Sequence, residues 1–433
     1  MDVLTAARVQ MEVSLAFHMI FAALGIGMPV LMLIAEGLWL RTGEPHYRDL
    51  ARKWAKATAL AFAIGAVSGT ALSFELGLLW PRFMAFAGGV IGPAFALEGY
   101  AFFIEAIFLG LYLYGWDRLS PRAHWWTGVP VALSGLASGI LVVAANAWMQ
   151  APVGMDPGAP FRSPAWLHMS LHSSLSCYIA TGFAVAGVYA TGMLRGRRDA
   201  YHRSGLGIAM AVGGATALLQ PLSGDLSARS IERYQPAKLA AMEAHFETRT
   251  HAPFIIGGVP DADAGVVRWA IEIPSGLSLL VGRHPATEVT GLDAFPRDEW
   301  PNVLIPHIAF QVMISCGLVL IAIALIWGWR RLRGGEGTRM LRAIVIASPL
   351  GFLALEAGWL VTEVGRQPWV VYGLMRTSDG VTPVSEVPLT LFGFALLYSA
   401  LGFALALLLR GLAARTRSHG NETTSRSADR SGS

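Results

Sequence analysis

Charged residues are scarce in this chain. Only 14% of its 433 residues are Asp, Glu, Lys or Arg, whereas a soluble chain of this length usually carries about 25%. Hydrophobic residues make up 54% of the chain. Apolar segments of roughly 20 residues recur along it, and this length crosses a hydrocarbon core of about 30 Å. The composition therefore excludes an ordinary soluble domain and indicates a polytopic helical membrane protein.

Cysteine is also scarce, and both cysteines, Cys177 and Cys316, fall inside apolar segments. They are too few for a disulfide scaffold and lack metal-site spacing. The first apolar segment, which starts at Val13, has no small-residue cleavage site, so we expect a retained helix rather than a signal peptide. The net charge of +4 does not indicate a nucleic-acid partner, because the arginines lie in short connections between apolar segments.

The fold class that follows is all-α, a bundle with nine transmembrane helices. Basic residues gather in the odd-numbered connections and in the tail, which the positive-inside rule makes cytoplasmic. The N-terminus is then outside, the C-terminus is cytoplasmic, and the long connection between helices 6 and 7 is extracytoplasmic. The expected spans are 13–40, 55–80, 93–115, 126–149, 168–194, 204–224, 303–328, 341–362 and 388–410.

This organisation divides the chain into four parts. Residues 1–224 carry helices 1–6, residues 225–302 form the outer loop, and residues 303–412 carry helices 7–9. A Ser/Thr/Arg-rich tail, residues 413–433, is predicted to be disordered. The outer loop contains one helical stretch, residues 236–247. A connection of this length in a compact bundle is usually functional.

Ligand-capable side chains share one depth in the predicted bundle. At about 1.5 Å of rise per helical residue, helices running in both directions bring them to the outer half of the bilayer. Such groups are costly inside a membrane and mark functional sites. The set is His18, Glu98, His172, Met313 and Glu363.

His172 and Met313 are the types of residue that hold a low-spin haem from its two sides. The alternative is that His172 is a packing histidine and Met313 fills the core. His168 lies four residues earlier on the same helix face, so spacing alone allows either histidine as the ligand. His18 and Glu363 would each hold an iron from one side and leave a position open, as oxygen chemistry requires.

Other readings of these two residues stay open on sequence alone. His18 can be a buried histidine whose hydrogen bonds are satisfied, and Glu363 can pair with Arg366, three residues further on.

Glu98 and Glu105 are seven residues apart, so both carboxylates face one side of a helix and suggest a proton path. The alternative for this pair is helix–helix hydrogen bonding.

Lys238 and Glu243 lie on the helical stretch of the outer loop. A quinol needs hydrogen-bond partners for its hydroxyls and a base for its protons, and these two residues would supply them. The alternative is a solvated helix with ordinary surface charges.

Taken together, the motifs resemble subunit I of the cytochrome bd-type quinol oxidases, over the chain up to about residue 412. Each motif is modest evidence alone, and their shared order is specific. They are Glu363 followed by Gly365-Arg-Gln-Pro-Trp369, Leu97-Glu-Gly99 with Phe102-Phe-Ile-Glu105, Gly115-Trp-Asp-Arg118, Asn146-Ala-Trp-Met-Gln-Ala-Pro-Val-Gly154, and Lys238-Leu-Ala-Ala-Met-Glu243.

The resemblance implies a terminal oxidase that oxidises quinol at the outer loop and reduces O2 to water without pumping protons. It implies that His172 and Met313 ligate the iron of a low-spin haem b. His172 rather than His168 matches the family position, six residues before Tyr178. His18 and Glu363 would ligate the two active-site haems, which are a high-spin haem b and either haem d or a further haem b.

The same resemblance implies roles for residues around those haems. Glu98 would be the distal carboxylate of the oxygen site, Glu105 part of the proton path, and Trp359 a tryptophan between the haems. Arg366 belongs to the motif of Glu363. Lys238 and Glu243 would bind quinol. One departure is Gln311, two residues before Met313, where the best-known members carry an arginine; a changed low-spin haem potential is the expected consequence.

The outer loop lacks the long insertion of some members, so the chain is expected to be a short-loop form, with relatives that include cyanide-insensitive enzymes. The resemblance also implies a bacterial inner-membrane location, a related membrane subunit II as partner, and room for a small single-helix subunit. Two other hypotheses stay open here. One is a haem-free proton or ion transporter that uses the intramembrane carboxylates, and the other is a haem b electron-transfer subunit that does not reduce O2.

Overall fold

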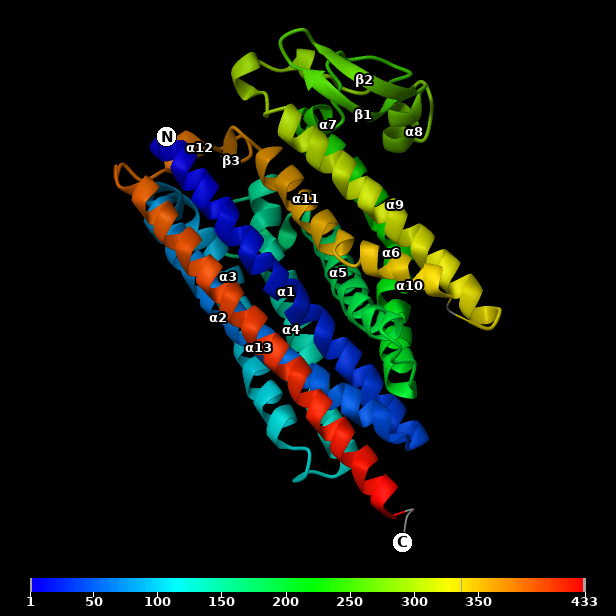
Figure 1. Ribbon diagram of the computed structural model, residues 1–433. Coiled ribbons are helices and arrows are strands. Elements are labelled where there is room, and N and C mark those ends of the chain that lie inside the picture. Colours follow the sequence, from blue (N-terminus) through cyan, green and yellow to red (C-terminus); the bar gives the residue numbers. More distant parts are fainter. Residues whose placement is uncertain (1, 336, 431–433) are drawn as a thin grey trace.

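The structure, a computed structural model, describes residues 2–335 and 337–430, with side chains described as far as residue 408. Within this part of the chain, nine helical segments are long and apolar enough to cross a membrane, as predicted (Figure 1). They are α1 (Val3–Thr42), α2 (Pro45–Leu79), α3 (Pro81–Tyr114), α4 (Pro121–Gln150), α5 (Trp166–Leu194), α6 (Ala200–Tyr234), α9 (Leu304–Leu332), α10 with α11 (Thr338–Ala347 and Leu350–Val364), and α13 (Val387–Arg430).

The helices extend beyond the predicted spans, because the apolar pattern ends before the helical backbone does. Helix α3 begins at Pro81, where a proline is favoured because the first helical N–H has no partner inside the helix. Pro93, which we expected to start this helix, lies in its interior. Helix α1 ends at Thr42 and is followed by Gly43, whose φ of 75° is readily adopted only by glycine.

The eighth span is divided, contrary to the single helix expected over 341–362. Helix α10 ends at Ala347 and α11 starts at Leu350. Between them, Pro349 has no N–H to donate to the preceding turn, and it forces the break. Ser348 caps the end of α10 through hydrogen bonds from its backbone N and its Oγ to Val345 O.

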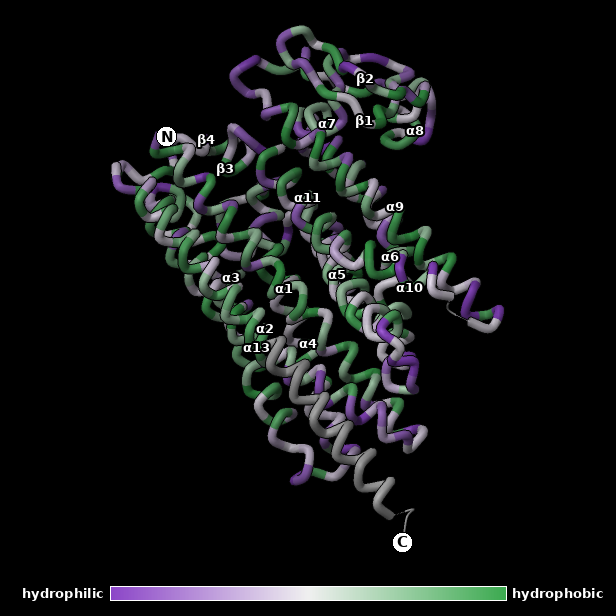
Figure 2. The backbone as a smooth tube through the Cα atoms, viewed as in Figure 1, coloured by the Kyte–Doolittle hydropathy of each residue, from purple (hydrophilic) through white to green (hydrophobic). Residues whose placement is uncertain are grey.

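Helices adjacent in sequence pack in pairs: α1 along α2, α3 along α4, and α5 along α6, while α9 packs along α11. Helix α13 returns along α1 on the outside of the bundle (Figure 1). Hydrophobic residues dominate the middle of the bundle, and hydrophilic stretches lie in the connections at its two ends (Figure 2). The predicted tail, residues 413–433, begins beyond the last described side chain; residues 431–433 lie outside the described part of the chain altogether, and the disorder of the tail stays a prediction.

Helix α6 continues to Tyr234, beyond the predicted end of the sixth span at residue 224, so the first part of the outer connection is helical. The loop holds a short helix, α7, that stops at Met242 instead of continuing to residue 247, and an antiparallel hairpin that the sequence did not suggest. Its elements are α7 (Pro236–Met242), β1 (Phe254–Asp261), β2 (Val266–Ile273), α8 (Gly276–Gly282) and short 3-10 turns at Leu292–Ala294 and Arg297–Glu299. A 3-10 turn at Ala159–Arg162 precedes α5, and β3 (Trp369–Val371), β4 (Met375–Arg376) and α12 (Thr377–Gly380) join α11 to α13.

Two side chains of α9 fasten the hairpin to the bundle. The amide of Gln311 donates from Nε2 to Ile255 O (2.9 Å) and accepts at Oε1 from Gly257 N (3.0 Å), so it pairs with β1 much as a neighbouring strand would. One turn earlier, the ring nitrogens of the fully buried His307 lie 3.0 Å from Met242 O and from Gly257 O. The side-chain amide of Gln311 is thus bonded to the outer loop.

Candidate functional site

Two cavities of about 440 and 480 Å³ lie next to each other in the half of the bundle that carries the loop. The first is lined by His172, Met313 and Lys238, and the second by His18, Glu98, Glu105 and Glu363. Trp359 lines both cavities and therefore stands between them. The structure thus brings together the side chains that the sequence placed at one depth.

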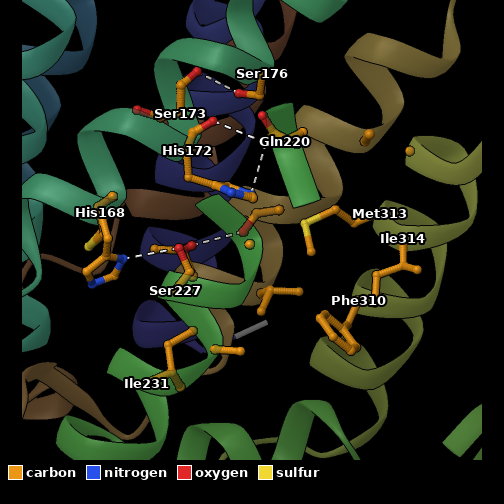
Figure 3. A pocket seen from close by; sticks show the side chains of 18 of the residues that line it. His168, His172, Ser173, Ser176, Gln220, Ser227, Ile231, Phe310, Met313 and Ile314 are labelled. Carbon is orange, nitrogen blue, oxygen red and sulfur yellow. Dashed lines mark hydrogen bonds between the residues drawn. The ribbon is translucent and has the colours of Figure 1, made fainter. Parts of the chain in front are cut away.

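In the first cavity, His172 on α5 lies across from Met313 on α9 (Figure 3). The Nδ1 of His172 lies 2.9 Å from Ser223 Oγ, and the hydroxyl of Ser223 donates to Gln220 O. Because that hydroxyl proton is already used, Nδ1 must carry the ring hydrogen, and Nε2 keeps its lone pair. The Gln220 amide donates to this Nε2 at 3.1 Å, so it must move before Nε2 can bind a metal.

The space beside Met313 depends on a glycine. A Cβ at Gly358 on α11 would come within 3.2 Å of Met313 Sδ. Gly358 lines the same cavity, so the absent side chain leaves room for a flat group next to the sulfur. A thioether and an imidazole lone pair on opposite sides of a largely apolar cavity suit the two axial positions of a low-spin haem.

In the second cavity, His18 on α1 is held in the same way as His172. Its Nδ1 lies 3.0 Å from Ser68 Oγ, and the Ser68 hydroxyl donates to Gly65 O, which leaves the His18 Nε2 lone pair available. A Cβ at Gly69 would come within 2.9 Å of the His18 ring, so glycine again provides the space. This histidine can hold a metal-centred group from one side.

Both carboxylate oxygens of Glu363, at the end of α11, have a donor. Asn146 Nδ2 donates to Oε1 and Arg366 Nη2 donates to Oε2, each at 2.6 Å. Arg366 is 3% exposed and also donates from Nε to Trp369 O. The sequence left two alternatives for Glu363, an ion pair with Arg366 or a position in the site. The structure shows both, because the carboxylate that pairs with Arg366 also lines the second cavity.

Two further carboxylates of α3 reach the second cavity. Glu98 Oε1 accepts from Ser138 Oγ of α4 at 3.0 Å. Glu105 is 4% exposed, and its Oε1 has no hydrogen-bond partner. The residue packs against two glycines: a Cβ at Gly135 would meet Oε2 at 3.2 Å, and a Cβ at Gly25 would meet Oε1 at 3.9 Å. The column of carboxylates predicted from the spacing therefore does face the cavity.

Lys238 of α7 is buried, and it points toward Glu363 rather than into solvent. Its Nζ donates to Gln150 Oε1 (2.9 Å) and to Thr362 O (3.0 Å). Gln150 Nε2 in turn donates to Asn146 Oδ1 at 3.1 Å. Burial, followed by the charge of Arg366, lowers the pKa of Lys238 to about 7, while Glu363 opposes this shift. A continuous hydrogen-bonded chain therefore joins Lys238 in the first cavity to Glu363 in the second.

Glu243, the predicted partner of Lys238, lies elsewhere. It is 1% exposed, neither of its carboxylate oxygens has a hydrogen-bond partner, and it does not line either cavity. Burial raises the pKa of Glu243 to about 8, because no nearby group offsets the cost of charging it. The structure therefore does not bring Lys238 and Glu243 together, and the alternative of a solvated helix is also wrong for both residues.

Sequence reasoning gave no role to the residues that position the candidate ligands, although one of the quoted motifs contains Asn146 and Gln150. All of them are polar side chains of ordinary appearance on neighbouring helices, so the sequence did not mark them as positioning residues. Glu12 was missed too, although it lines the second cavity beside Glu363. The missed positioning residues are Ser68, Ser138, Asn146, Gln150, Gln220 and Ser223.

The fold and the two cavities are typical of one class of protein, a membrane-bound haem oxidoreductase: His172 and Met313 face each other in one cavity, His18 and Glu363 line the other, and Trp359 stands between them. Comparison with known proteins specifies it further. The sequence model of the family described as cytochrome bd terminal oxidase subunit I matches residues 6–417. The chain therefore belongs to the cytochrome bd terminal oxidase subunit I family, whose members carry haem.

Similar proteins agree with this assignment over nearly their whole length. The chain is 38% identical to a putative cytochrome bd menaquinol oxidase subunit I of Bacillus subtilis (strain 168), covering 94% of this chain and 96% of the relative. It is 28% identical to the cytochrome bd-II ubiquinol oxidase subunit 1 of Escherichia coli (strain K12), covering 87% and 89%.

Among solved structures, the chain is similar to the bd oxidase from Geobacillus thermodenitrificans, with a TM-score of 0.91 and 38% identity over 96% of this chain and 99% of that one. The hypotheses of a haem-free transporter and of an electron-transfer subunit without oxygen chemistry are set aside, because the family is one of terminal oxidases.

Proposed function

We propose that this chain oxidises quinol on the loop side of the membrane and contributes the site where O2 is reduced to water, adding to the proton motive force without pumping. The observation that carries the proposal is the pair of cavities with Trp359 in both walls. One cavity has ligands on two sides, as electron transfer requires, and the other has single-sided ligands, as oxygen binding requires.

The ligands fit haem by their chemistry. His172 Nε2 and Met313 Sδ would hold a low-spin haem b, while His18 Nε2 and Glu363 would each hold an active-site haem, a high-spin haem b and either haem d or a further haem b. Bound haem would supply electron transfer and an open iron position for O2. The protein supplies the orientation: Ser223 and Ser68 fix the imidazoles, and Asn146 and Arg366 fix the carboxylate.

The remaining site residues handle protons and substrate. Glu98, hydrogen-bonded to Ser138, is placed to hold a proton at the oxygen site, and Glu105 lies two turns away on the same helix and would pass protons toward it. Lys238, in the wall of the first cavity, would hold a quinol oxygen. Glu243 would act on quinol only if the loop rearranged, because its carboxylate is enclosed without partners.

The assembly proposed is a bacterial inner-membrane complex. The N-terminus is outside and the C-terminus cytoplasmic, supported by the distribution of arginines. Membrane lipid and a related subunit II, with room for a small single-helix subunit, would cover the exposed apolar faces, such as Phe74 and Leu78 on α2 and Tyr100 and Phe103 on α3.

The test is a reduced-minus-oxidised spectrum of the purified complex with haem extraction, combined with O2 consumption on added quinol. Haem b with a far-red chlorin band would identify haem d at the oxygen site, and haem b alone would identify a further haem b there. Folded protein without a Soret band, or with haem but no quinol-dependent O2 consumption, would refute the proposed function.

A further inference from the structure

The β1–β2 hairpin of the outer loop has one face that carries no charge. Side chains alternate between the two faces of a strand, so every second residue of β1 shares a face with its cross-strand partners in β2. Ile256 pairs with Ile271 in this way, and the charged residues of both strands belong to the opposite face. The large side chains of the apolar face are Phe254, Ile256, Val267, Trp269, Ile271 and Ile273.

Most of this apolar face is exposed. Ile271 is 66% exposed and Trp269 is 84% exposed, and Ile256 and Ile273 are exposed beside them. An exposed apolar surface of neighbouring side chains marks an interaction site. Trp269 also has a φ of 58°, a left-handed conformation that is costly for a bulky residue and that occurs mostly where function requires it.

The hydrogen bonds to α9 set the depth of the hairpin. Gln311 is the eighth residue of α9 and lies roughly 10 Å below the first one, at about 1.5 Å per residue. Its side chain is bonded to Ile255 O and Gly257 N, on the two neighbours of Ile256. Strand β1 therefore lies beside the first turns of α9 and not beyond the end of that helix (Figure 1).

The other end of the loop structure gives a similar depth. Arg283, which follows α8, pairs with Asp225 of α6 at 2.7 Å. Asp225 is the first charged residue after the apolar stretch of α6, so it marks the polar boundary of the membrane. At this level the first turns of α9 expose Leu304 and Ile308. The apolar face of the hairpin is thus level with side chains that a membrane helix presents to lipid.

We propose that the apolar face of the hairpin lies in the membrane leaflet on the loop side, at the boundary between headgroups and acyl chains, with Trp269 as its anchor. Tryptophan is enriched at this boundary because its ring is amphipathic. A leaflet fits the face better than a protein partner does, because the face continues the lipid-facing surface of α9. The contact depends on neither haem nor quinol, and it holds the outer loop against the membrane.

The first experiment labels single cysteines in the complete oxidase, reconstituted into vesicles of phosphatidylethanolamine and phosphatidylglycerol. Both native cysteines are buried, so a fluorescent maleimide reacts with the introduced one. Ile271→Cys tests the apolar face, and Ala264→Cys, in the exposed turn of the same hairpin, is the matched control. A nitroxide on the lipid acyl chain near the headgroup should quench the label at position 271 and shift its emission to shorter wavelength relative to the label at 264. Iodide in the water should quench only the label at 264.

Two results of the labelling overturn the proposal. Quenching at position 271 by iodide and not by the nitroxide lipid would place the apolar face in water. Protection of that label from both quenchers would mean that protein covers the face, either a partner subunit or a second copy of this chain.

The second experiment removes the anchor. Trp269→Ser combined with Ile271→Ser should release the hairpin from the leaflet, so protease cleavage within residues 254–273 should accelerate by about tenfold in the same vesicles. Val259→Ser, an exposed apolar residue of the opposite face, is the matched control and should leave cleavage unchanged. Equal cleavage of the double variant and the wild type would overturn the role of Trp269. If the double variant fails to assemble, the labelling decides alone.

Discussion

Replacing Asn146 by alanine tests whether the hydrogen-bonded chain between the cavities holds Glu363, the proposed haem ligand, in place. Asn146 donates to Glu363 Oε1 at 2.6 Å and accepts from Gln150, which is bonded to Lys238. In the variant, Arg366 still holds Oε2, and Gln150 keeps its bond to Thr362 O. The loss is therefore confined to one donor of a carboxylate that is 14% exposed.

The size of the effect follows from that single bond. A hydrogen bond to a charged group contributes about 1.5–3 kcal/mol, which is roughly a 10- to 150-fold change in an equilibrium constant. Loss of a partner that orients a metal ligand typically lowers metal affinity or activity by about 10–100-fold. We therefore expect Asn146→Ala to weaken binding of the haem proposed for Glu363 by about 10–100-fold and to spare the haem proposed for His172 and Met313.

The assay is the haem-to-protein ratio of the purified complex, read with the separate low-spin and high-spin bands. Ser223→Ala is the matched control, because it removes the partner of His172 Nδ1 and leaves the Glu363 network intact. It should disturb the low-spin band only. The reasoning about Glu363 would be refuted if Asn146→Ala had the same haem content and the same high-spin bands as the wild type, even when cells are grown with little haem.

Three further predictions follow from the same geometry. His172→Leu and Met313→Leu should each abolish the low-spin haem band, and survival of that band in both variants would make the ligand assignment wrong. Glu98→Gln should keep all haems and lower O2 turnover by about 100-fold, measured with pre-reduced enzyme; unchanged turnover would remove Glu98 from the proton chemistry. Glu243 has a pKa raised to about 8 when folded, against an ordinary 4.5, so the folded loop binds this proton more tightly than the unfolded loop. Its stabilisation is complete below about pH 4.5 and is lost as the pH rises toward 8. Protease cleavage within residues 235–302 should accelerate over that range, and Glu243→Gln should reduce this pH dependence while the exposed control Glu247→Gln should not.

Sequence periodicity and length were sufficient for the membrane helices, because a helix that faces lipid must be apolar along its whole span. Periodicity and length were less informative for segments outside the apolar spans, where polar and apolar residues are mixed. The hairpin β1–β2 was missed because β1 is held by hydrogen bonds to Gln311 and His307 of α9, residues that are distant in sequence. The end of α6 was placed too early because its last turns are polar and lie above the apolar span.

The candidate ligands were predictable for a similar reason. An intramembrane His, Met or Glu is conspicuous against an apolar background, so His18, Glu98, His172, Met313 and Glu363 were selected by residue type and depth. Their roles depended on the resemblance to a known family, because spacing alone did not separate His172 from His168. In the structure His172 lies across from Met313, whereas His168 lies toward Ser227, and this arrangement favours His172 (Figure 3).

The sequence by itself predicted nine membrane spans, matching the nine candidate spans in the described part of the chain, and it predicted ligand-capable residues in one half of the bilayer. The cost of burying polar groups in hydrocarbon leaves few other arrangements. Only the tertiary structure decided which side chains face each other. It directed Lys238 toward Gln150 instead of Glu243, put Trp359 between two cavities, and left the Nε2 of His168 without a partner. Such pairings arise from the packing angles and rotations of whole helices, which no local stretch of sequence encodes.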